Sequence, residues 1–576
     1  MSPLLKWKRY RSHIALFCFA TFIMASVDIP SAQTLDQKFD EYLIGAGRVL
    51  HFSGTVLVMK DNKILFTRGY GMADISASKP NTPETKYLLG SVTKQFTATA
   101  IMQLSEKKLL NLNDPIAKYL PDYPQPAADK VTIYHLLTNT SGIADYTDLP
   151  EFDEMYLNPA GSEDDETYMK PARFEEIVSM FKDLPLAFEP GSEWYYSSSN
   201  YYLLGLVIER VSGESYGGYV RKNIFEPLGM KNSGYPDGFI DHVPGLAKGY
   251  RFDSTDNLIP APVVHSSLPF SAGGLYSTVG DMAKWDQGLR NGTLLSLESL
   301  TQMFTPFKWR YGCGWEIDTL FGYQMVSHGG SGGGFTSSFL RFVDEPFCVV
   351  VFSNNDAGHM IRIALGLAAI AYGEPYDVPT KKTPIAIDGK MLDDYVGAYE
   401  IGADRYNIVT REGDSLYLFR TGGKRIRLQA EAEDKFFYDI DNTRTLTFVR
   451  DKAGHVAEQI IHGNGRDVRA PRIEGEKAQQ LLESLIPATV DPATYRAYAG
   501  DYEVAPGFVI SFICRDNRFF TKATGQDEVE IFPRSETEFF LKVADGQVRF
   551  VKDSTGTVTG LIIHQGGREL SAKKVR

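Results

Sequence analysis

A serine and a lysine lie one helical turn apart at Ser91 and Lys94, where an apolar segment begins. A serine hydroxyl becomes a strong nucleophile when a neighbouring base takes its proton. A lysine is such a base only when neutral, which requires burial or a nearby positive charge to lower its pKa. Because residues i and i+3 of a helix share one face, this pair has the spacing for nucleophilic catalysis.

The Ser-x-x-Lys spacing alone is a weak signal, since the chain holds at least four further copies. They begin at Ser76, Ser105, Ser179 and Ser571. The copy at Ser91 differs in its surroundings, because Gly90 precedes it and the apolar run TATAIMQL follows it. This pattern predicts a turn buried at the start of an amphipathic helix. Burial favours the neutral amine, and backbone N–H groups at a helix start stabilise a developing oxyanion.

Further segments extend the pattern from Leu88 to Phe339. They are LLGSVTKQFTATAIMQL (88–104), VTIYHLLTNTSGI (131–143), EPGSEWYYSSSNYYLLG (189–205), SAGGLYSTVGDMAKW (271–285), YGCGW (311–315) and VSHGGSGGGFTSSF (326–339). In this order they resemble the serine hydrolases related to class C β-lactamases and penicillin-binding proteins. Each segment alone is a weak match, but the occurrence of all of them in the same order makes the resemblance specific.

The resemblance implies a catalytic role for each matching residue. Ser91 would be acylated, Lys94 would be its partner base, and Tyr196 would be a second proton carrier that serves the leaving group. His328 would lie beside the substrate. The backbone N–H groups of Ser91 and Ser331 would form the oxyanion hole, where one donor contributes about 3 kcal/mol. The sequence leaves open how the lysine and the tyrosine divide the role of base.

The resemblance also implies four substrate-binding residues: Ser198, Asn200, Gly329 and Gly330. Ser198 stands where the family has an asparagine that helps hold the lysine and binds the substrate's amide carbonyl. Serine is shorter but still donates and accepts hydrogen bonds. Ser198 and Asn200 together also form an alternative Ser-x-Asn motif, whereas the spacing to Tyr201 favours the Tyr196 alignment. The replacement argues against strong β-lactamase activity.

Two other serines satisfy the Gly-x-Ser-x-Gly pattern of α/β-hydrolases, in GESYG (213–217) and GGSGG (329–333). That motif requires a buried strand before the serine and a helix after it. GESYG follows a helical pattern and is interpreted as an interhelical turn, whereas GGSGG precedes a predicted strand. Neither is therefore expected to hold the nucleophile.

The histidines and cysteines show no metal-binding spacing, since HExxH and CxxC are both absent from the sequence. The glycines from Gly329 to Gly334 contain neither a dinucleotide fingerprint nor a phosphate loop. The sequence therefore predicts no metal and no cofactor.

The composition describes a folded protein, with 43% hydrophobic and 23% charged residues among 576. A formal net charge of −12 makes nucleic acid and anionic lipid poor partners. The four cysteines are too few for a disulfide framework. The sequence does not determine an oligomeric state.

The first 32 residues have the pattern of a secretory signal. Lys6, Lys8, Arg9 and Arg11 precede the apolar run from Ile14 to Val27. The run is shorter than the ~20 residues of a spanning helix, and small residues follow it. We expect cleavage near Ala32, a periplasmic or secreted protein, and no membrane association beyond this segment. An uncleaved anchor is the alternative.

An internal repeat marks the end of the chain. YVGAYE at Tyr395 returns as YAGDYE at Tyr498, and FVRDKAGHVAEQIIH at Phe448 returns as FVKDSTGTVTGLIIH at Phe550. Short aromatic-rich runs separated by Gly, Asp and Asn are typical of antiparallel strands that close into small barrels. The repeat predicts two tandem β-barrel modules.

The predicted fold is an α/β (α+β) β-lactamase-like domain, with an antiparallel sheet flanked by helices plus a helical subdomain, followed by two small antiparallel β-barrels. The predicted boundaries are a signal peptide at 1–32, a hydrolase domain at 33–375, a linker at 376–389, a barrel at 390–474, a linker at 475–492 and a barrel at 493–576. This layout resembles that of the D-aminopeptidases of the same family.

The expected function is hydrolysis, through an acyl-enzyme, of a small-molecule or short-peptide substrate. The expected substrates are above all D-amino-acid amides or peptides, including fragments derived from peptidoglycan. The alternatives are a small-ester esterase or weak β-lactamase, and a non-catalytic protein that binds cell-wall fragments or acts as a scaffold. The acidic stretch from Glu151 to Tyr168 is either a solvated face or a rim that attracts a substrate ammonium.

Overall fold

A computed structural model describes residues 33–152 and 168–575 of the chain. Within these ranges it leaves out residues 254, 256, 403–404, 422–424, 440, 464–465, 506–507, 525, 527, 543–545 and 566–567. The predicted signal segment (1–32) and most of the acidic stretch (151–168) lie outside the described residues. The predictions made for them are therefore unchanged.

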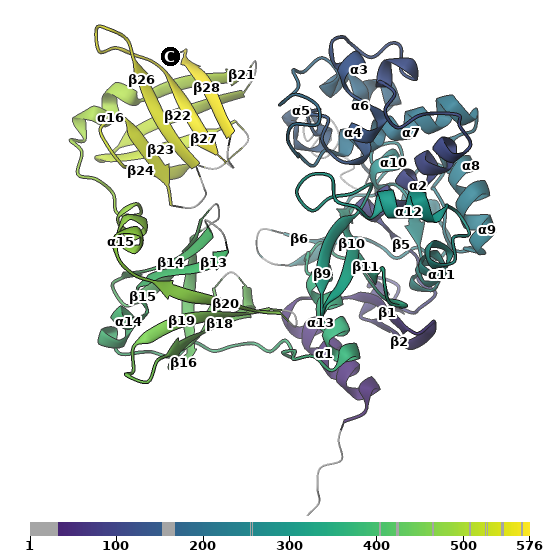
Figure 1. Cartoon of the computed structure of the whole chain (residues 1–576), viewed down its shortest axis with the longest axis horizontal. Helices are drawn as coiled ribbons and strands as arrows, with labels where there is room; N and C mark the ends of the chain where they lie inside the picture. Colours follow the sequence, from purple (N-terminus) through teal and green to yellow (C-terminus); the bar gives the residue numbers. More distant parts are fainter. Residues whose placement is uncertain are drawn as a thin grey trace, which may run out of the picture.

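The central sheet of the first domain combines strands from the two ends of that domain's sequence (Figure 1). The strand order is β2-β1-β12-β11-β10-β9, and all neighbours are antiparallel. The bounds are β1 (Gly54–Lys60), β2 (Lys63–Tyr70), β9 (Glu316–Leu320), β10 (Tyr323–Gly332), β11 (Phe335–Phe342) and β12 (Phe347–Ser353). The strand predicted after GGSGG (329–333) is β11.

Helices cover both faces of this sheet. Alternate strand residues such as Val349 and Val351 pack against α1 (Leu35–Val49) and α13 (Met360–Tyr372). The intervening residues, including Val350 and Phe352, belong to a second core on the opposite face. That core contains α2 (Thr93–Glu106), α7 (Ser198–Ser212) and α11 (Val279–Arg290). Burial on both sides explains the nearly continuous apolar run FCVVVFS of β12.

The remaining elements of this part are short. The helices are α3 (Ala127–Lys130), α4 (Ile133–Leu137), α5 (Pro150–Phe152), α6 (Phe174–Phe181), α8 (Tyr216–Val220), α9 (Glu226–Leu228), α10 (Phe270–Gly273) and α12 (Leu297–Met303). The helical turns are η1 (Gly90–Val92), η2 (Ile116–Lys118), η3 (Tyr146–Asp148), η5 (Arg221–Phe225) and η6 (Ile240–His242). The short strands are β3 (Met72–Asp74), β4 (Lys79–Pro80), β5 (Tyr87–Leu88), β6 (Tyr250–Phe252), β7 (Leu258–Pro260) and β8 (Tyr276–Ser277).

Two closed antiparallel barrels follow, as the repeat predicted. The first contains β13 (Gly397–Gly402), β14 (Arg405–Glu412), β15 (Ser415–Arg420), β16 (Arg425–Ala432), β17 (Lys435–Tyr438), β18 (Asp441–Arg450), β19 (Val456–Gly463) and β20 (Arg466–Ile473). The second contains β21 (Gly500–Ala505), β22 (Phe508–Arg515), β23 (Arg518–Ala523), β24 (Val529–Pro533), β25 (Glu538–Leu541), β26 (Gly546–Lys552), β27 (Val558–Gln565) and β28 (Arg568–Lys574). The helix α14 (Gly389–Tyr395) leads into the first barrel, and α15 (Glu476–Glu483) and α16 (Ala493–Tyr498) lie between the two barrels.

The repeated tyrosines have the same role in both barrels. The Tyr399 hydroxyl donates to the Tyr395 carbonyl at 2.8 Å, and the Tyr502 hydroxyl donates to the Tyr498 carbonyl at 2.8 Å. Each pair anchors the short helix that enters a barrel to its first strand. The repeated motif therefore has a structural role in each barrel.

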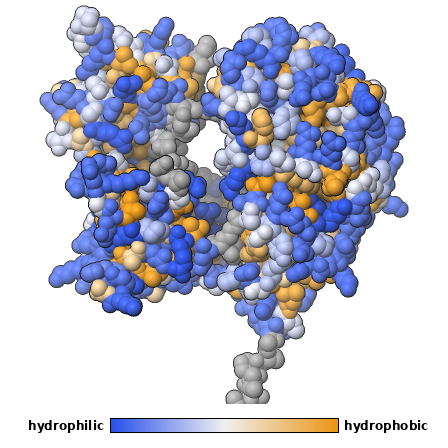
Figure 2. Space-filling model, in the orientation of Figure 1, coloured by the Kyte–Doolittle hydropathy of each residue, from blue (hydrophilic) through white to orange (hydrophobic). Residues whose placement is uncertain are grey.

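The barrels lie beside the first domain, with an opening between them in the space-filling view (Figures 1 and 2). Val378 and Pro379 of the connecting segment pack closely on Gly45 of α1. The structure does not test the exact domain boundaries, which stay predictions. In the part of the chain that the structure describes, no helix is long and apolar enough to cross a bilayer, and Cys313, Cys348 and Cys514 are free thiols.

A buried ion cluster fastens α11 to the sheet. Asp286 is fully buried and accepts hydrogen bonds at 2.7 Å from the Nε atoms of Arg341 on β11 and Arg290 on α11. Arg290 also donates to the carbonyl oxygen of Phe342 at 2.7 Å. Charges in such an interior are tolerated only when they are paired and hydrogen-bonded.

Replacing Asp286 tests this connection. Asp286→Ala leaves Arg341 buried without its counter-ion, and we expect a loss of about 3–5 kcal/mol in the free energy of unfolding. Urea unfolding followed by circular dichroism measures it. Arg173→Ala is the control, because the Arg173–Glu176 ion pair is exposed and contributes less than about 1 kcal/mol. An unchanged urea midpoint for Asp286→Ala would contradict the argument.

Candidate active site

The predicted serine–lysine pair is formed in the structure. Ser91 lies in η1, and Lys94 lies in the first turn of α2 and is fully buried. The Lys94 Nζ atom is 3.0 Å from the Ser91 Oγ atom and donates to the carbonyl oxygen of Ala272 at 2.9 Å. The backbone enters this turn through Gly90, whose φ of +53° lies in the left-handed region that favours glycine.

Burial prepares the lysine to act as a base. Burial lowers the pKa of Lys94 to about 7, while the negative charge of Asp145 acts in the opposite direction. The amine therefore exchanges between charged and neutral forms near neutral pH. A neutral amine within hydrogen-bond distance of a hydroxyl can accept its proton, which is the requirement for an activated nucleophile.

Tyr196 lies on the other side of this pair, in the loop before α7. The Lys94 Nζ atom is 5.0 Å from the centre of the Tyr196 ring. Burial raises the pKa of Tyr196 above its ordinary value, and a hydrogen bond with Ser91 partly opposes this shift. The phenol therefore keeps its proton at neutral pH, next to the serine oxygen. Its position suits a group that donates a proton during the reaction.

His328 lies on β10 as a neutral imidazole. Its Nδ1 atom is 2.6 Å from the Gly329 carbonyl oxygen, and its Nε2 atom is 3.1 Å from the Tyr311 hydroxyl. Burial and the nearby Lys94 charge lower the pKa of His328 to about 3. A neutral ring with these partners donates from Nδ1 and accepts from the phenol at Nε2. Its ring centre lies 6.1 Å from that of Tyr196.

A close approach of two glycines brings η1 against β10. A side-chain carbon at Gly90 would lie 2.6 Å from the Ser331 nitrogen, and one at Gly330 would lie 2.0 Å from the Leu89 carbonyl oxygen. No side chain fits at either position. The backbone nitrogens of Ser91 and Ser331 therefore lie near one another, as an oxyanion hole requires.

A cavity of about 280 Å³ opens at these two serines. It is lined by Leu88, Gly90, Ser91, Tyr146, Thr147, Phe152, Met169, Ser198, Val264, Leu268, Pro269, Ala272, Gly273, Ser331, Gly332 and Gly333. Apolar side chains dominate its wall, and the serine hydroxyls supply the polar groups. This is the usual composition of a small-molecule site.

The predicted substrate-binding residues divide into two groups. Ser198 lines the cavity. Asn200 does not, because it is fully buried and its amide accepts from Ser141 at 2.6 Å and donates to Asn139 at 2.9 Å. The predicted substrate-binding role of Asn200 therefore does not fit its position, and its side chain fixes the neighbouring loop.

Gly329 and Gly330 also lie outside the cavity lining. The resemblance implied a substrate-binding role for both glycines, whereas Gly330 accommodates the backbone of η1. The missing side chain is thus needed for packing within the protein. The same packing aligns Ser331 with Ser91.

Sequence reasoning missed two residues of the site. Asp145 is buried and accepts from the Ser198 backbone nitrogen at 2.8 Å, which caps α7 and adds a negative charge near Lys94. Tyr311 is fully buried and bonds His328. Both lie in or beside segments that the resemblance includes, but nothing in their spacing indicates which way they point.

The two competing serine motifs lack the context of an α/β-hydrolase elbow. Ser215 caps α8, in the turn between α7 and α8, and its side chain accepts from the Gly218 nitrogen. Ser331 is the second-last residue of β10, and the next element is strand β11. Neither serine therefore lies between a strand and a helix. This agrees with the sequence analysis, which did not expect either motif to hold the nucleophile.

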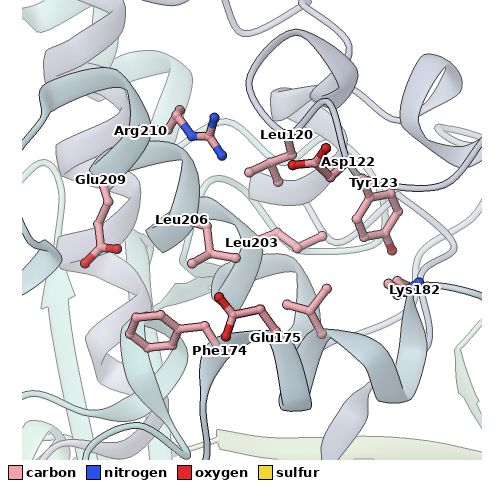
Figure 3. Close-up of a pocket in the computed structure, with 11 residues that line it drawn as sticks. Leu120, Asp122, Tyr123, Phe174, Glu175, Lys182, Leu203, Leu206, Glu209 and Arg210 are labelled. Carbon is pink, nitrogen blue, oxygen red and sulfur yellow. The ribbon is translucent and has the colours of Figure 1, made fainter.

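A larger cavity of about 650 Å³ lies away from this site (Figure 3). It is formed by α6, the C-terminal half of α7 and the segment around Tyr123. Leu203 and Leu206 lie in its centre, and Arg210 and Glu175 come from opposite sides. None of the predicted catalytic residues lines it.

Comparison with known proteins agrees with this geometry. Residues 36–372 match the model of the family described as Beta-lactamase. The chain belongs to the beta-lactamase family. It is a serine hydrolase. Residues 486–574, which include the second barrel, match a domain of unknown function (DUF3471).

Individual relatives support the same assignment. Penicillin-binding protein 4* of Bacillus subtilis is 31% identical over 418 residues, which cover 68% of this chain and 89% of the relative. A D-aminopeptidase of Brucella anthropi is 23% identical over 573 residues, covering 94% and 97%. The octameric penicillin-binding protein homologue from Pyrococcus abyssi superimposes with a TM-score of 0.54 and 25% identity, covering 84% and 97%. The chain thus has the D-aminopeptidase-like layout expected from its sequence.

The lowered pKa of Lys94 predicts the acidic side of the pH profile. Acylation needs the neutral amine, so kcat/KM should rise with pH through about 7, the pKa of Lys94. Asp145→Asn removes the charge that raises this pKa, and the midpoint should therefore move about one unit lower. Initial rates across the pH range measure it.

Asp183→Asn is the matched control, because this carboxylate is exposed and pairs with Lys182 at the surface. Its profile should equal that of the wild type. A midpoint that stays in place or rises in Asp145→Asn would contradict the predicted coupling. His328 does not contribute to the rise of kcat/KM near pH 7, because its pKa of about 3 lies far below that pH.

Proposed function

We propose that this protein hydrolyses small amides, peptides or esters through an acyl-enzyme, with D-amino-acid derivatives as its preferred substrates. The observation that carries the proposal is the 3.0 Å contact between Lys94 Nζ and Ser91 Oγ, at the mouth of an apolar cavity. The fully buried lysine has a pKa of about 7, so it is available as a base under ordinary conditions.

In the proposed acylation step, the Ser91 oxygen attacks the substrate carbonyl and Lys94 takes its proton. The backbone N–H groups of Ser91 and Ser331 stabilise the resulting oxyanion. Tyr196, which keeps its proton at neutral pH, serves the leaving group as the carbonyl reforms. Water then attacks the acyl-enzyme, with the same groups acting in reverse.

The substrate class rests on the cavity and on the relatives. A volume of about 280 Å³ suits one amino-acid side chain rather than a large ligand. Phe152, Met169, Val264 and Leu268 give it an apolar wall. The relatives include D-aminopeptidases and teichoic acid D-alanine hydrolases, which act on D-configured groups according to their names. Peptidoglycan-derived peptides belong to this class.

One observation favours esters as a second substrate class. Ser198 lines the cavity where the family has an asparagine, and its hydroxyl is shorter than an amide. A substrate that needs an amide carbonyl held at this point loses part of its binding, whereas a simple ester does not. This favours esterase activity or weak β-lactamase activity over strong β-lactamase activity. The convergence of Ser91, Lys94 and Tyr196 argues against a non-catalytic scaffold.

Secretion is part of the proposal. The basic start and short apolar run of residues 1–32 support export to the periplasm or the medium. Export would place the enzyme where peptidoglycan fragments occur. Fractionation of cells that express the full chain, with mass determination of the amino terminus, tests both export and cleavage near Ala32.

The nucleophile can be tested by covalent labelling. Ser91→Ala should abolish labelling by a fluorophosphonate probe and reduce turnover at least about 1,000-fold, because the nucleophile is lost. Ser215→Ala is the matched control and should label normally. Turnover is measured with D- and L-amino-acid p-nitroanilides, short esters and a chromogenic cephalosporin. Retained labelling in Ser91→Ala, or a preference for L-substrates, would contradict the proposal.

A further inference from the structure

A second cavity lies between α6, the C-terminal half of α7 and the segment around Tyr123 (Figure 3). Its volume is about 650 Å³, against about 280 Å³ for the cavity at Ser91, and no described residue lines both. Cavities of roughly 300 to 1,000 Å³ are the size at which proteins bind small molecules. The proposed acyl transfer does not use this second cavity, so its lining is considered as a site of its own.

Apolar side chains form the floor of the cavity. Leu203 is fully buried, whereas Phe174, Val178 and Leu206 pack against the core but keep part of their surface exposed. Leu203 and Leu206 lie at the centre of the cavity (Figure 3). Covering such apolar surface with an apolar group removes it from water, which is favourable. The floor therefore suits the apolar body of a ligand.

Tyr123 supplies a polar group that has no partner within the described part of the protein. The residue lines the cavity and is only 7% exposed. None of the residues that the structure describes forms a hydrogen bond with its hydroxyl. A buried hydroxyl without a partner is unfavourable, and folded proteins satisfy nearly all such groups. A hydrogen-bonding group inside the cavity would supply the missing partner.

The charged side chains around the cavity are mostly acidic. Asp122, Glu175 and Glu209 line it, and none of the three forms an ion pair with another described residue. Lys182 lines it too, but its ammonium already pairs with Asp183 at 2.7 Å. Unpaired carboxylates attract cations and repel anions. The lining therefore favours a ligand that carries a positive charge.

One cation in the lining remains, and its position does not cancel the acidic groups. Arg210 is exposed and belongs to the last turn of α7, where the partial negative charge at the end of a helix favours it. Its guanidinium points away from the Glu209 carboxylate (Figure 3). Three carboxylates thus line the cavity together with a single cation that is not already paired.

Glu209 is the carboxylate best suited to hold such a charge. It is half-buried, and its hydrogen-bond donor among the described residues is the backbone N–H of Tyr216, at 2.8 Å. Burial raises the pKa of Glu209, and this single hydrogen bond opposes the shift. A partly buried carboxylate gains most from a cation that also donates hydrogen bonds. An ammonium group supplies both.

We propose that this cavity is a second binding site, separate from the catalytic one, for an organic amine with an apolar alkyl or aryl body. The ammonium group pairs with Glu209, and the apolar body covers Leu203 and Leu206. Tyr123 lies at the opposite end of the cavity from Glu209 (Figure 3), where its hydroxyl is available to a polar atom of a longer ligand. The site does not depend on the proposed acyl-enzyme mechanism.

Three probes with one apolar body and different head groups test the ligand class. They are 4-phenylbutylamine, 4-phenylbutan-1-ol and 4-phenylbutyrate, titrated into the full chain by isothermal titration calorimetry. The amine should bind most tightly, the alcohol more weakly and the carboxylate most weakly, because the lining is acidic. An amine that binds no better than the carboxylate would overturn the proposal, and so would the absence of binding by all three.

Two variants locate the amine. Glu209→Gln keeps an acceptor for the Tyr216 N–H but removes the charge, and it should weaken amine binding about five- to tenfold while leaving the alcohol unchanged. Val178→Trp fills the cavity and should remove the binding of both. Glu214→Gln is the matched control, because this carboxylate pairs with Lys222 outside the cavity, and it should bind like the wild type.

The remaining outcomes are equally decisive. Unchanged amine binding in Glu209→Gln, or an equal loss in Glu214→Gln, would show that the amine does not pair with Glu209 and would overturn the proposal. Retained binding in a folded Val178→Trp would place the amine elsewhere, with the same consequence. Thermal unfolding followed by circular dichroism shows whether Val178→Trp is folded, and if it is not, the comparison of Glu209→Gln with Glu214→Gln decides alone.

Discussion

The burial of one amine is the constraint on which the rest of this domain depends. Lys94 is fully buried, and its Nζ atom is held by two uncharged groups, the Ser91 hydroxyl and the Ala272 carbonyl oxygen. Lowering its pKa from 10.5 to about 7 costs the folded state about 5 kcal/mol at neutral pH. Because the folded pKa is depressed, this cost is absent above about pH 10.5, grows as the pH falls to about 7, and is constant below. The two apolar cores on either side of the sheet must offset it.

The site forms where two rigid parts of the domain meet. The helical side supplies Ser91 and Lys94, and strand β10 of the sheet supplies His328 and Ser331. Their registration depends on the contact between Gly90 and Gly330, where any side chain would collide with the opposite backbone. A site built on elements rather than on flexible loops keeps its groups within the narrow geometry that catalysis needs.

Sequence reasoning succeeded where the signal is local or repeated. The barrels followed from the two tyrosine motifs, and the serine–lysine pair followed from helical spacing at Ser91. It failed where the direction of a side chain depends on contacts with segments that are distant in the sequence. Asn200 belongs to a motif, yet its amide turns away from the cavity to bond Asn139 and Ser141. Asp145 has no motif of its own, and only the folded chain brings its charge near Lys94.

The three ionisable groups at the site are differentiated by their surroundings rather than by their chemistry. Burial moves the pKa of Lys94 down to about 7 and that of His328 down to about 3, and it raises the pKa of Tyr196. At neutral pH the site therefore holds one group that can accept a proton, one that can donate it, and one neutral dipole fixed by Tyr311. Separated pKa values are what assign acid and base roles in an active site. Desolvation thus performs two tasks here, since it activates the lysine and prevents the histidine from competing with it.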